Sequence, residues 1–540
     1  MSSPLRRSAR LVVLLTLLLL ASALAAPAAV ARQPEDTQVA GIDIDALTIP
    51  ELQALMNDNR LKSVQLTQFY LHRIQKLNPI LNTVITVSPT ALADARAADA
   101  ARRAGDTRPL LGMPIIVKDN IHTTGMPTTA GSWALAGNAP ADAFIVERLR
   151  AAGAIILGKA NLSEWANFRS IPSSSGWSGV GGQNNMAYVL DRNPCTSSSG
   201  SGVVASADLA VAAVGTETDG SIVCPSGANS VVGIKPTVGL LSREGIVPIS
   251  ADQDTAGPMA RNVTDAAVLL GAMTGADPAD PATAAQVGNA FTDYTQFLNA
   301  GALAGATIGY WREGTLVNAE GQVIDAQVDA IMEATVAALE AQGATVVEVE
   351  LPLDDVFGPE FDALLCEFKT DINTYLDTYV PGDPPMTLTD LIEFHTTDPR
   401  ENIWNSLIFE LADATGGRTD PACAAARAAA TPVTQARLDA LLGSVDAIIA
   451  PTNGPAWVTD PVLGDLSGDF SKFIGSSTAA AVAGYANITV PAGYADGVLP
   501  IGVSFTGGRW DEPNLISLAY AFEQATQVRV PPSFIPTIGP

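Results

Sequence analysis

Hydrophobic and polar residues follow two patterns along this chain, one typical of amphipathic helices and the other of buried strands. In residues 49–78, Leu66, Tyr70 and Ile74 belong to an apolar series at helical spacing, which predicts two helices. Residues 154–158 (AIILG) instead form a short continuous apolar run, which favours a buried strand. The two patterns alternate at the spacing of an α/β protein.

The same periodicities, together with glycine and proline positions, predict the other elements. In the first half they are strands at 81–87 and 110–117, strands and turns within 233–247, and helices at 91–103, 144–153 and 263–271. In the second half they are strands at 306–311, 344–351, 447–450, 488–491 and 501–506, and helices at 323–342, 422–442 and 515–523. No internal repeat and no break in composition is visible after residue 41, which predicts one large α/β domain.

Two segments fit either the protein core or the surroundings of an active site. Residues 359–415 are largely helical and rich in aromatic side chains, so this helical insertion either caps a site or packs as ordinary core. Core packing is the favoured interpretation. Residues 170–185 form a long Gly/Ser-rich loop that either lines a cleft or is a plain surface loop.

Residues 1–31 have the pattern of a secretory signal peptide. Three arginines precede the apolar run 11–20, which is short for a membrane span, and small residues suited to cleavage follow it. We therefore expect export to the periplasm or the extracellular space, without stable membrane association. Residues 32–48 are then an N-terminal linker, and residues 49–530 are the main domain.

Composition indicates a large folded core, because 47% of the residues are hydrophobic and 16% are charged. The 56 acidic residues outnumber the 30 basic residues, which gives a formal net charge of -26. This excess of negative charge argues against nucleic acids and anionic membranes as partners. The sequence leaves the oligomeric state open and is compatible with a monomer.

The chain contains four cysteines and three histidines, and neither set has the spacing of a metal site. We interpret Cys195 and Cys224 as small packing residues beside the serine-rich loops described next. Cys366 and Cys423 could form a disulfide after export. The three scattered histidines disfavour both a His-rich zinc site and a catalytic triad that depends on histidine.

Two loops of small residues, 196–202 and 215–221, flank an Ala/Val-rich segment and can bring two stretches of backbone close together. They contain Ser197 and Ser221. A serine hydroxyl becomes a good nucleophile only beside a base, and with few histidines the alternative base is a buried neutral lysine. Lys118, which ends a strongly apolar segment, is the candidate. Backbone N–H groups of the second loop could surround an oxyanion.

Several ordered motifs around these residues resemble those of the amidase signature family. They are Gly112-Met113-Pro114 with Lys118-Asp119-Asn120, Gly158-Lys159-Ala160-Asn161, Ser197-Ser198, Gly215-Thr216 with Gly220-Ser221-Ile222, Gly233-Ile234-Lys235-Pro236-Thr237, Gly257-Pro258-Met259-Ala260-Arg261, Val490-Pro491-Ala492-Gly493 and Leu499-Pro500-Ile501-Gly502. The coincidence of so many motifs makes the resemblance specific. It implies an α/β fold, a single large domain with a central mixed β-sheet covered by helices on both faces.

The resemblance implies a Ser–Ser–Lys triad that needs neither a cofactor nor a metal. Ser221 corresponds to the nucleophile. Ser197, which in this family follows a cis peptide bond, corresponds to the serine that relays the proton to neutral Lys118. Ser198 corresponds to a residue that supports the lysine by hydrogen bonding.

The resemblance also places the oxyanion hole at the backbone N–H groups of Thr218, Asp219, Gly220 and Ser221. In the implied reaction the nucleophile attacks an amide carbonyl, and ammonia or an amine leaves. Water then hydrolyses the acyl-enzyme.

Three departures from the commonest family pattern concern the substrate. The usual Gly-Gly-Ser-Ser-Gly-Gly run appears as residues 195–200 (CTSSSG), the usual Gly-Gly-Ser contains Asp219, and a common arginine is replaced by Val223. Backbone donors survive these changes, whereas loss of the arginine alters the polarity near the site. The two loops look most like the bacterial peptide amidase branch, which removes the C-terminal amide nitrogen from peptide amides. The implied partner is therefore a small amide or peptide-amide substrate.

Three other interpretations remain open at this point. The same triad could act on fatty-acid or aryl amides. A cytoplasmic amidotransferase subunit is also similar in sequence, but the export signal disfavours it. An exported solute-binding protein would fit the length and the signal, although the chain has no obvious linker halfway along.

Overall fold

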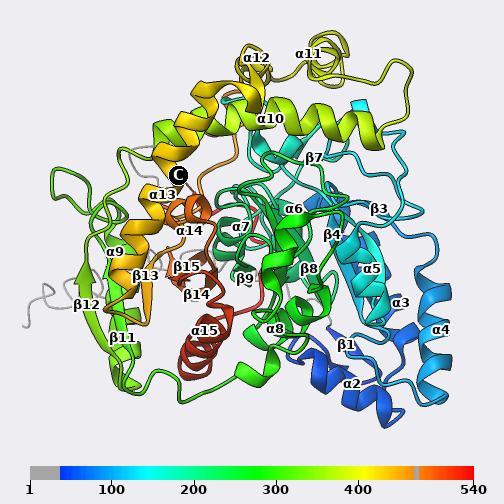
Figure 1. Ribbon diagram of the computed structural model, residues 1–540. Coiled ribbons are helices and arrows are strands. Elements are labelled where there is room, and N and C mark those ends of the chain that lie inside the picture. The colour runs from blue at the N-terminus through cyan, green and yellow to red at the C-terminus, as the bar shows by residue number, and fades with distance from the viewer. Residues whose placement is uncertain (1–36, 468–473, 540) are drawn as a thin grey trace, which may run out of the picture.

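A mixed sheet of eleven strands lies at the centre of the computed structural model, which describes residues 37–467 and 474–539 (Figure 1). In spatial order the strands are β12 (Thr345–Val349), β11 (Thr307–Trp311), β13 (Ala447–Pro451), β15 (Leu499–Thr506), β14 (Asn487–Ala495), β9 (Val232–Lys235), β10 (Thr255–Ala260), β8 (Ala212–Glu217), β4 (Pro114–Lys118), β5 (Ile155–Ala160) and β3 (Val84–Val87). β4 runs parallel to β5 and β8, and β11 runs parallel to β12 and β13, whereas the other neighbours are antiparallel.

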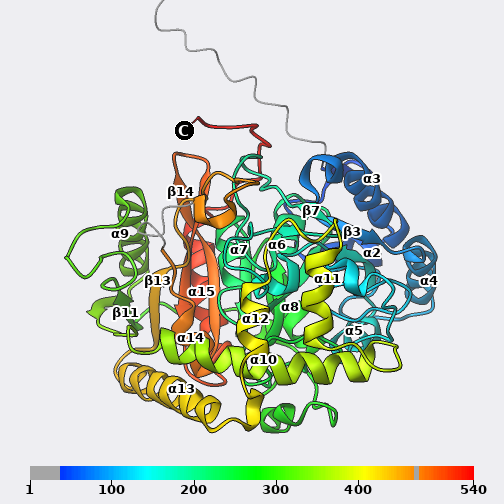
Figure 2. The same cartoon turned by 90° about the horizontal axis from the view of Figure 1, so that it is seen from above.

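Helices flank this sheet on both faces (Figures 1 and 2). They are α2 (Ile49–Asn57), α3 (Ser63–Leu81), α4 (Ala91–Arg103), α5 (Phe144–Ala151), α6 (Ser199–Ser206), α7 (Val223–Ala228), α8 (Val263–Met273), α9 (Ala326–Ala341), α10 (Phe357–Tyr379), α11 (Leu388–Thr397), α12 (Leu407–Asp413), α13 (Pro421–Leu442), α14 (Thr478–Ala483) and α15 (Glu512–Thr526). α6 and α7 contact one another and the central strands, while α8, α9 and α15 form another connected group against the sheet. The predicted fold class is confirmed.

The predicted elements agree with the structure where periodicity and a stop signal coincide. The helix predicted at 91–103 is α4, and Gly105 follows it with φ +94°, a conformation that favours glycine. The apolar segment between the two serine loops had no predicted elements. In the structure α6 ends at Ser206, the chain turns at Asp208 with φ 56°, and β8 begins at Ala212. Both elements are buried on all sides, so hydrophobic periodicity could not divide them.

The predicted insertion 359–415 is a separate layer of helices, α10 to α12, which packs with α13 above the sheet in Figure 1. Phe368, Ile372 and Phe409 are fully or almost fully buried in a small apolar core of their own. The segment is therefore packed core, as favoured. Its residues also line cavities, as described below, so the two interpretations of the sequence are not exclusive.

The predicted signal peptide, residues 1–31, lies outside the described residues. Within the predicted linker, β1 (Gln38–Val39) and β2 (Ile42–Asp43) pair as a short hairpin, and Ile44 is fully buried in the main core. The described part of the linker is therefore packed against the domain.

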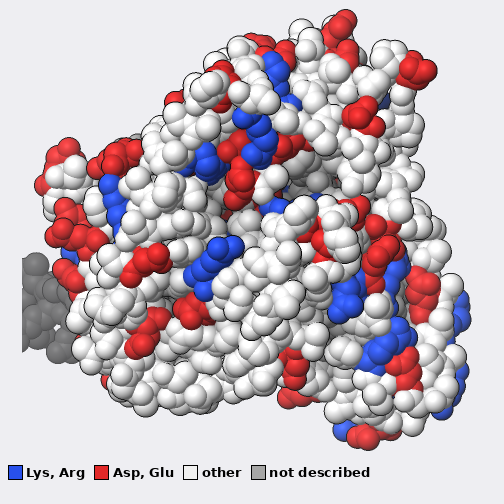
Figure 3. Space-filling view, in the orientation of Figure 1, with Lys and Arg blue, Asp and Glu red and all other residues white. Residues whose placement is uncertain are grey.

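The surface carries its excess of negative charge without a large basic patch on the face drawn in Figure 3. Acidic and basic side chains are interspersed there, and much of the face is uncharged. In the part of the chain that the structure describes, no helix has the length and apolar character needed to cross a bilayer.

Candidate active site

The candidate catalytic residues lie close to the carboxyl ends of two neighbouring strands of the central sheet. Lys118 is the last residue of β4, and residues 218–221 follow the end of the parallel neighbour β8. Ser197 precedes α6, which packs on both strands. Because the carboxyl ends of neighbouring parallel strands lie at the same edge, side chains from distant parts of the chain converge there.

Lys118 is completely buried and is held by three oxygen atoms. Its Nζ atom lies 2.8 Å from Ser197 Oγ, 2.9 Å from Thr216 Oγ1 and 3.3 Å from the Thr216 carbonyl oxygen. The predicted pairing of Lys118 with Ser197 is thus present in the geometry, and Thr216 completes the environment of the amine.

Burial changes the protonation of Lys118. Desolvation of the ammonium form lowers its pKa from the ordinary lysine value to about 7, although Asp254 and Glu217 partly oppose this by favouring the charged form. The Asp254 carboxyl is itself buried, which raises its pKa to about 6 and so weakens this opposition at mildly acidic pH. Near neutral pH a large fraction of Lys118 is therefore the neutral amine that a general base requires.

Ser197 occupies an unusual place in the backbone. The peptide bond between Thr196 and Ser197 is cis, as the family resemblance implied. The Ser197 carbonyl oxygen accepts a hydrogen bond of 3.0 Å from the Ser163 N–H, and the Thr196 hydroxyl donates to Ser163 Oγ at 2.8 Å. These contacts hold the first serine loop against the loop after β5.

Ser198 does not hydrogen-bond to Lys118, which differs from the expected direct support. Its Oγ atom accepts from the Thr216 N–H at 3.1 Å and donates to the Thr216 carbonyl at 3.0 Å. Ser198 therefore holds Thr216, the residue that contacts the lysine. The support is indirect because β8 places Thr216 between the two side chains.

Ser221 lies in the turn between β8 and α7, and its side chain is almost buried. Its carbonyl oxygen accepts a hydrogen bond of 3.1 Å from the Ser198 N–H, which joins the two serine loops. Within the described residues no hydrogen bond joins the hydroxyl groups of Ser221 and Ser197. In unliganded sites such contacts are often long and tighten only with bound substrate.

The turn that carries Ser221 presents several free donors. Within the described residues, the N–H groups of Thr218, Asp219, Gly220 and Ser221 donate to no protein acceptor. Gly220 has φ +76°, which lets the turn reverse sharply. The predicted oxyanion donors are thus uncommitted, as binding of a tetrahedral oxyanion requires.

The Asp219 side chain hydrogen-bonds to residues at the start of α14. Its two carboxylate oxygens accept hydrogen bonds from Ser477 Oγ at 2.5 Å and from Thr478 Oγ1 at 2.6 Å. Burial raises the pKa of Asp219, and these two hydroxyl groups oppose the rise. The acidic residue that replaces the family's usual glycine thus anchors the turn to the start of α14.

Two cavities adjoin the two serine loops. The larger has a volume of about 840 Å³ and is walled in part by Thr196, Asp219, Gly220, Trp311 and Phe357. The smaller, of about 350 Å³, is lined in part by Asn120, Thr216, Thr218, Tyr375 and Tyr379. The large cavity has the size of a small-molecule or short-peptide site. Ile171 and Ser175 of the Gly/Ser-rich loop 170–185 line the larger cavity, so this loop lines a cleft, which is one of the two interpretations that the sequence left open.

The interpretation of the cysteines is corrected by the structure. Cys195 and Cys224 form a disulfide that joins the two serine loops, so they are not merely packing residues. Cys366 and Cys423 are buried free thiols and do not form the bridge that seemed open to them. Sequence spacing could not reveal which cysteines pair, because it does not show which loops fold together.

Replacing both Cys195 and Cys224 by serine should lower the free energy of unfolding by about 3–4 kcal/mol, since the crosslink closes a loop of 29 residues. Amide hydrolysis should fall as well, because the disulfide would no longer hold the loop that contains Thr196 against the loop that contains Asp219. Chemical denaturation under non-reducing conditions measures the first effect. The double replacement of Cys366 and Cys423 by serine is the control, and an equal loss of activity there would contradict a specific role for the crosslink.

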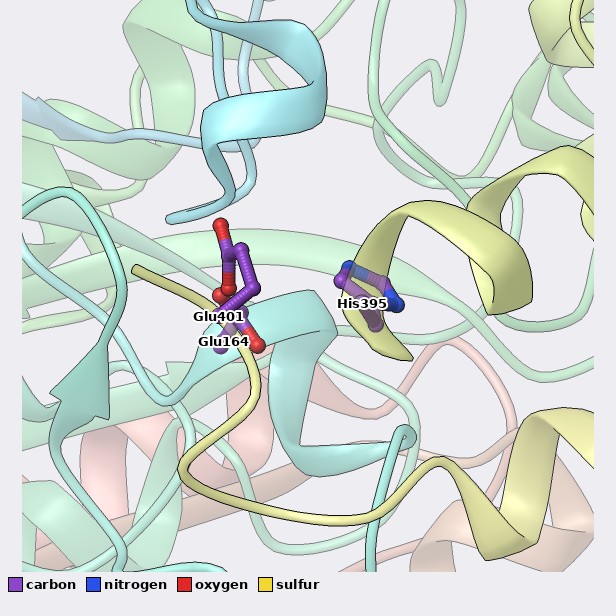
Figure 4. A group of neighbouring side chains, drawn as sticks. All are labelled: Glu164, His395 and Glu401. Carbon is purple, nitrogen blue, oxygen red and sulfur yellow. The ribbon is translucent and has the colours of Figure 1, made fainter. Parts of the chain in front are cut away.

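Within the described residues, no histidine hydrogen-bonds to Lys118. His122 Nε2 is 2.8 Å from the Tyr375 hydroxyl, and burial lowers its pKa to about 3. His395 lies near Glu164 and Glu401, a buried group that has the ligand types of a metal site (Figure 4). Arg169 makes ion pairs with both carboxylates, so the group acts as an ion-pair cluster that joins the insertion to the core.

Several residues around Lys118 were not predicted from the sequence to belong to the site. Thr216 and Asn120 were noticed only as parts of motifs, although their side chains hydrogen-bond to each other at 2.9 Å beside the lysine. Asp254 accepts a 2.6 Å hydrogen bond from the Thr218 hydroxyl, and Ser477 binds Asp219. The motif positions of the first two were a usable signal. Asp254 and Ser477 carry none, because only the tertiary fold places them here.

Comparison with known proteins agrees with this geometry. The family model described as Amidase matches residues 65–516. The X-ray structure of native peptide amidase from Stenotrophomonas maltophilia is 47% identical, aligns over 91% of this chain and 99% of its own, and has a TM-score of 0.84. A probable amidase of Arabidopsis thaliana is 40% identical over 503 residues, covering 91% of this chain and 92% of its own.

A more distant relative is named for a different reaction. One glutamyl-tRNA(Gln) amidotransferase subunit from Acinetobacter baumannii is 34% identical over 493 residues, covering 90% of this chain and 97% of its own. Together with the fold and the family match, these likenesses show that the chain belongs to the amidase signature family. It is an amide hydrolase, and the interpretation as a solute-binding protein is set aside.

Proposed function

We propose that this amide hydrolase is exported and converts C-terminal peptide amides to the free acid and ammonia through Ser221, Ser197 and Lys118. The observation that carries the mechanism is the 2.8 Å hydrogen bond between buried Lys118 and Ser197. A buried lysine with a pKa of about 7 and no salt bridge within the described residues is poised to accept a proton.

In the first chemical step, Ser221 Oγ forms a bond to the amide carbonyl carbon. Its proton passes to Ser197, whose own hydroxyl proton passes to neutral Lys118. The carbonyl electrons move onto oxygen, where the N–H groups of residues 218–221 stabilise the negative charge. The carbon–nitrogen bond then breaks, and the proton held by Lys118 returns through Ser197 to the departing nitrogen as ammonia.

In the second step, water replaces ammonia at the same position. The relay takes a proton from the water, which attacks the acyl-enzyme, and returns it to Ser221 Oγ as the ester bond breaks. The net reaction is an amide plus water giving a carboxylic acid plus ammonia. Proton transfer of this kind contributes roughly 10²–10⁴-fold to the rate.

Two observations support peptide amides as the substrate class. The relative from Stenotrophomonas maltophilia is named a peptide amidase, and its likeness extends over 91% of this chain. The large cavity, at about 840 Å³, has room for a short peptide rather than only a small amide. Two other observations support export. Residues 1–31 have the sequence pattern of a signal peptide, and the Cys195–Cys224 disulfide is the type of crosslink that persists outside the reducing cytosol.

Ammonia release measured with the purified chain tests the substrate class. We expect the highest kcat/KM on a short peptide amide, lower values on an aryl amide and a fatty-acid amide, and no ammonia from the same peptide with a free carboxyl terminus. Faster hydrolysis of the fatty-acid amide would contradict the assignment and favour the alternative substrate class. Detection of the mature N-terminus in the exported fraction of the source cells would test the signal peptide.

A further inference from the structure

Asn120 lies two residues beyond Lys118 and contacts the same hydroxyl group. Its side chain is 3% exposed, and Asn120 Nδ2 donates to Thr216 Oγ1 at 2.9 Å. Lys118 Nζ lies 2.9 Å from that same oxygen. The Thr216 hydroxyl is therefore shared between the proposed base and an amide group that can either donate or accept a hydrogen bond.

Three oxygen atoms lie within hydrogen-bonding distance of Lys118 Nζ, and the hydrogen bonds among them depend on how the amine and hydroxyl protons are oriented. A neutral amine has two N–H groups and one lone pair. The Thr216 carbonyl can only accept, so it takes one N–H group. The second N–H group and the lone pair are then divided between the hydroxyls of Thr216 and Ser197. Lys118 can act as a base toward Ser197 only if its second N–H group goes to Thr216 Oγ1.

For the Thr216 hydroxyl to accept from Lys118, its own proton needs another acceptor. Within the described residues, the only other group hydrogen-bonded to Thr216 Oγ1 is the Asn120 amide. Asn120 Oδ1 is buried and has no hydrogen-bond partner there. A half-turn of the amide exchanges its oxygen and nitrogen, and so brings Oδ1 to the hydroxyl proton.

The two orientations of the amide have opposite consequences. With Nδ2 toward Thr216, the hydroxyl proton has no acceptor except Lys118, and the lone pair of the amine turns away from Ser197. With Oδ1 toward Thr216, the hydroxyl donates to Asn120 and accepts from Lys118, which leaves the lone pair for Ser197. Asn120 lines the smaller cavity, so the amide has open space beside it.

We propose that Asn120 is a positioning residue that orients the Thr216 hydroxyl and thereby directs the lone pair of neutral Lys118 toward Ser197. This inference rests on the proposed triad. Within the described residues, the Asn120 side chain has no hydrogen bond to Lys118, Ser197 or Ser221, and its proposed action runs through Thr216.

Other charged groups also face this region and influence how the rate depends on pH. Around Lys118 and the smaller cavity they are Glu217, Arg243, Glu244, Asp254, Asp280 and Asp371. Arg243 is paired with Asp280 at 2.6 Å, and Asp371 is paired with Arg418 at 2.6 Å. All are unchanged by a substitution at Asn120, so a displaced pH profile reports on the new side chain.

The variants Asn120→Leu and Asn120→Asp distinguish the effect of Asn120 on the Thr216 hydroxyl from its contribution to packing. Asn120→Leu leaves the Thr216 proton no acceptor but Lys118, so kcat on a peptide amide should fall about 10- to 100-fold while KM changes less than about 3-fold. In Asn120→Asp the carboxylate accepts the Thr216 proton, so the plateau rate at high pH should stay within about 3-fold of the parent. Its charge should displace the acid limb of the profile upward by about one pH unit.

Tyr379→Phe is the matched control, because it removes a hydrogen bond of 3.1 Å to Glu244 beside the same cavity without touching Thr216. It should leave kcat and the acid limb unchanged. Parent-like kcat in folded Asn120→Leu, or an acid limb in Asn120→Asp that does not move, would overturn the role of Asn120. If Asn120→Leu does not fold, the Asn120→Asp profile decides alone. Turnover surviving in Ser221→Ala would instead overturn the triad itself.

Discussion

Replacing Ser221 by alanine should reduce amide hydrolysis by at least about 10⁴-fold, because the acyl-enzyme can no longer form. The substitution removes one nearly buried hydroxyl and leaves the N–H donors of the turn in place, so thermal unfolding should change little. Ammonia release from a peptide amide measures turnover. A serine-reactive fluorophosphonate should label the parent chain at Ser221 and leave the variant unlabelled.

Ser226→Ala provides the matched control for this prediction. Ser226 is a buried serine of the neighbouring helix α7, and its hydroxyl has no hydrogen-bond partner within the described residues. It should keep near-parental turnover and labelling. Near-normal turnover in Ser221→Ala would show that another group is the nucleophile.

Replacing Lys118 by methionine should reduce kcat by about 10²- to 10⁴-fold, the range expected when a general base is lost. In the parent chain the rate should rise with pH through about 7 and then level off. This direction follows because burial lowers the Lys118 pKa to about 7, and below that pH the charged ammonium cannot accept a proton. The variant should lose this acid limb along with its activity, as pH–rate profiles of kcat will show.

Lys235→Met distinguishes loss of the base from loss of any buried amine. Lys235 is completely buried, its pKa is lowered to about 8, and it donates to the Tyr485 carbonyl at 2.6 Å. Both substitutions remove a buried hydrogen-bond donor from its oxygen acceptors, so each should lower stability, by about 1–3 kcal/mol. Only Lys118→Met should remove catalysis. A comparable loss of kcat in folded Lys235→Met would mean that the effect is structural.

The second serine loop also shows how the departures from the family pattern bear on function. Asp219 keeps its backbone donor free and uses its side chain to bind Ser477 and Thr478. The substitution therefore leaves the implied oxyanion hole intact and changes how the wall of the large cavity is held. Val223, where an arginine is common, donates its backbone N–H to Glu217 at 3.0 Å. We therefore expect these departures to influence the choice of substrate rather than the type of reaction.

Local patterns alone were sufficient for many elements of the fold. The helix predicted at 91–103 and the strand predicted at 306–311 coincide closely with α4 and β11, because each has a clear periodicity and a defined end. The sequence pattern did not divide the segment around α6 and β8 into a helix and a strand. Elements that are buried on every side have no polar face to mark their period. The order of the strands in the sheet is a property of long-range pairing and is not encoded locally.

By itself, the sequence determined the chemistry offered by this protein: a lysine after an apolar strand, and serines in two glycine-containing loops, in the order of the amidase signature motifs. Only the tertiary structure decided the environment that gives these groups their properties. It buried Lys118 and so lowered its pKa, placed Thr216 and Asn120 beside it, and joined the loops through Cys195 and Cys224. Residue types are local information, whereas burial and contacts between distant segments arise only when the chain packs.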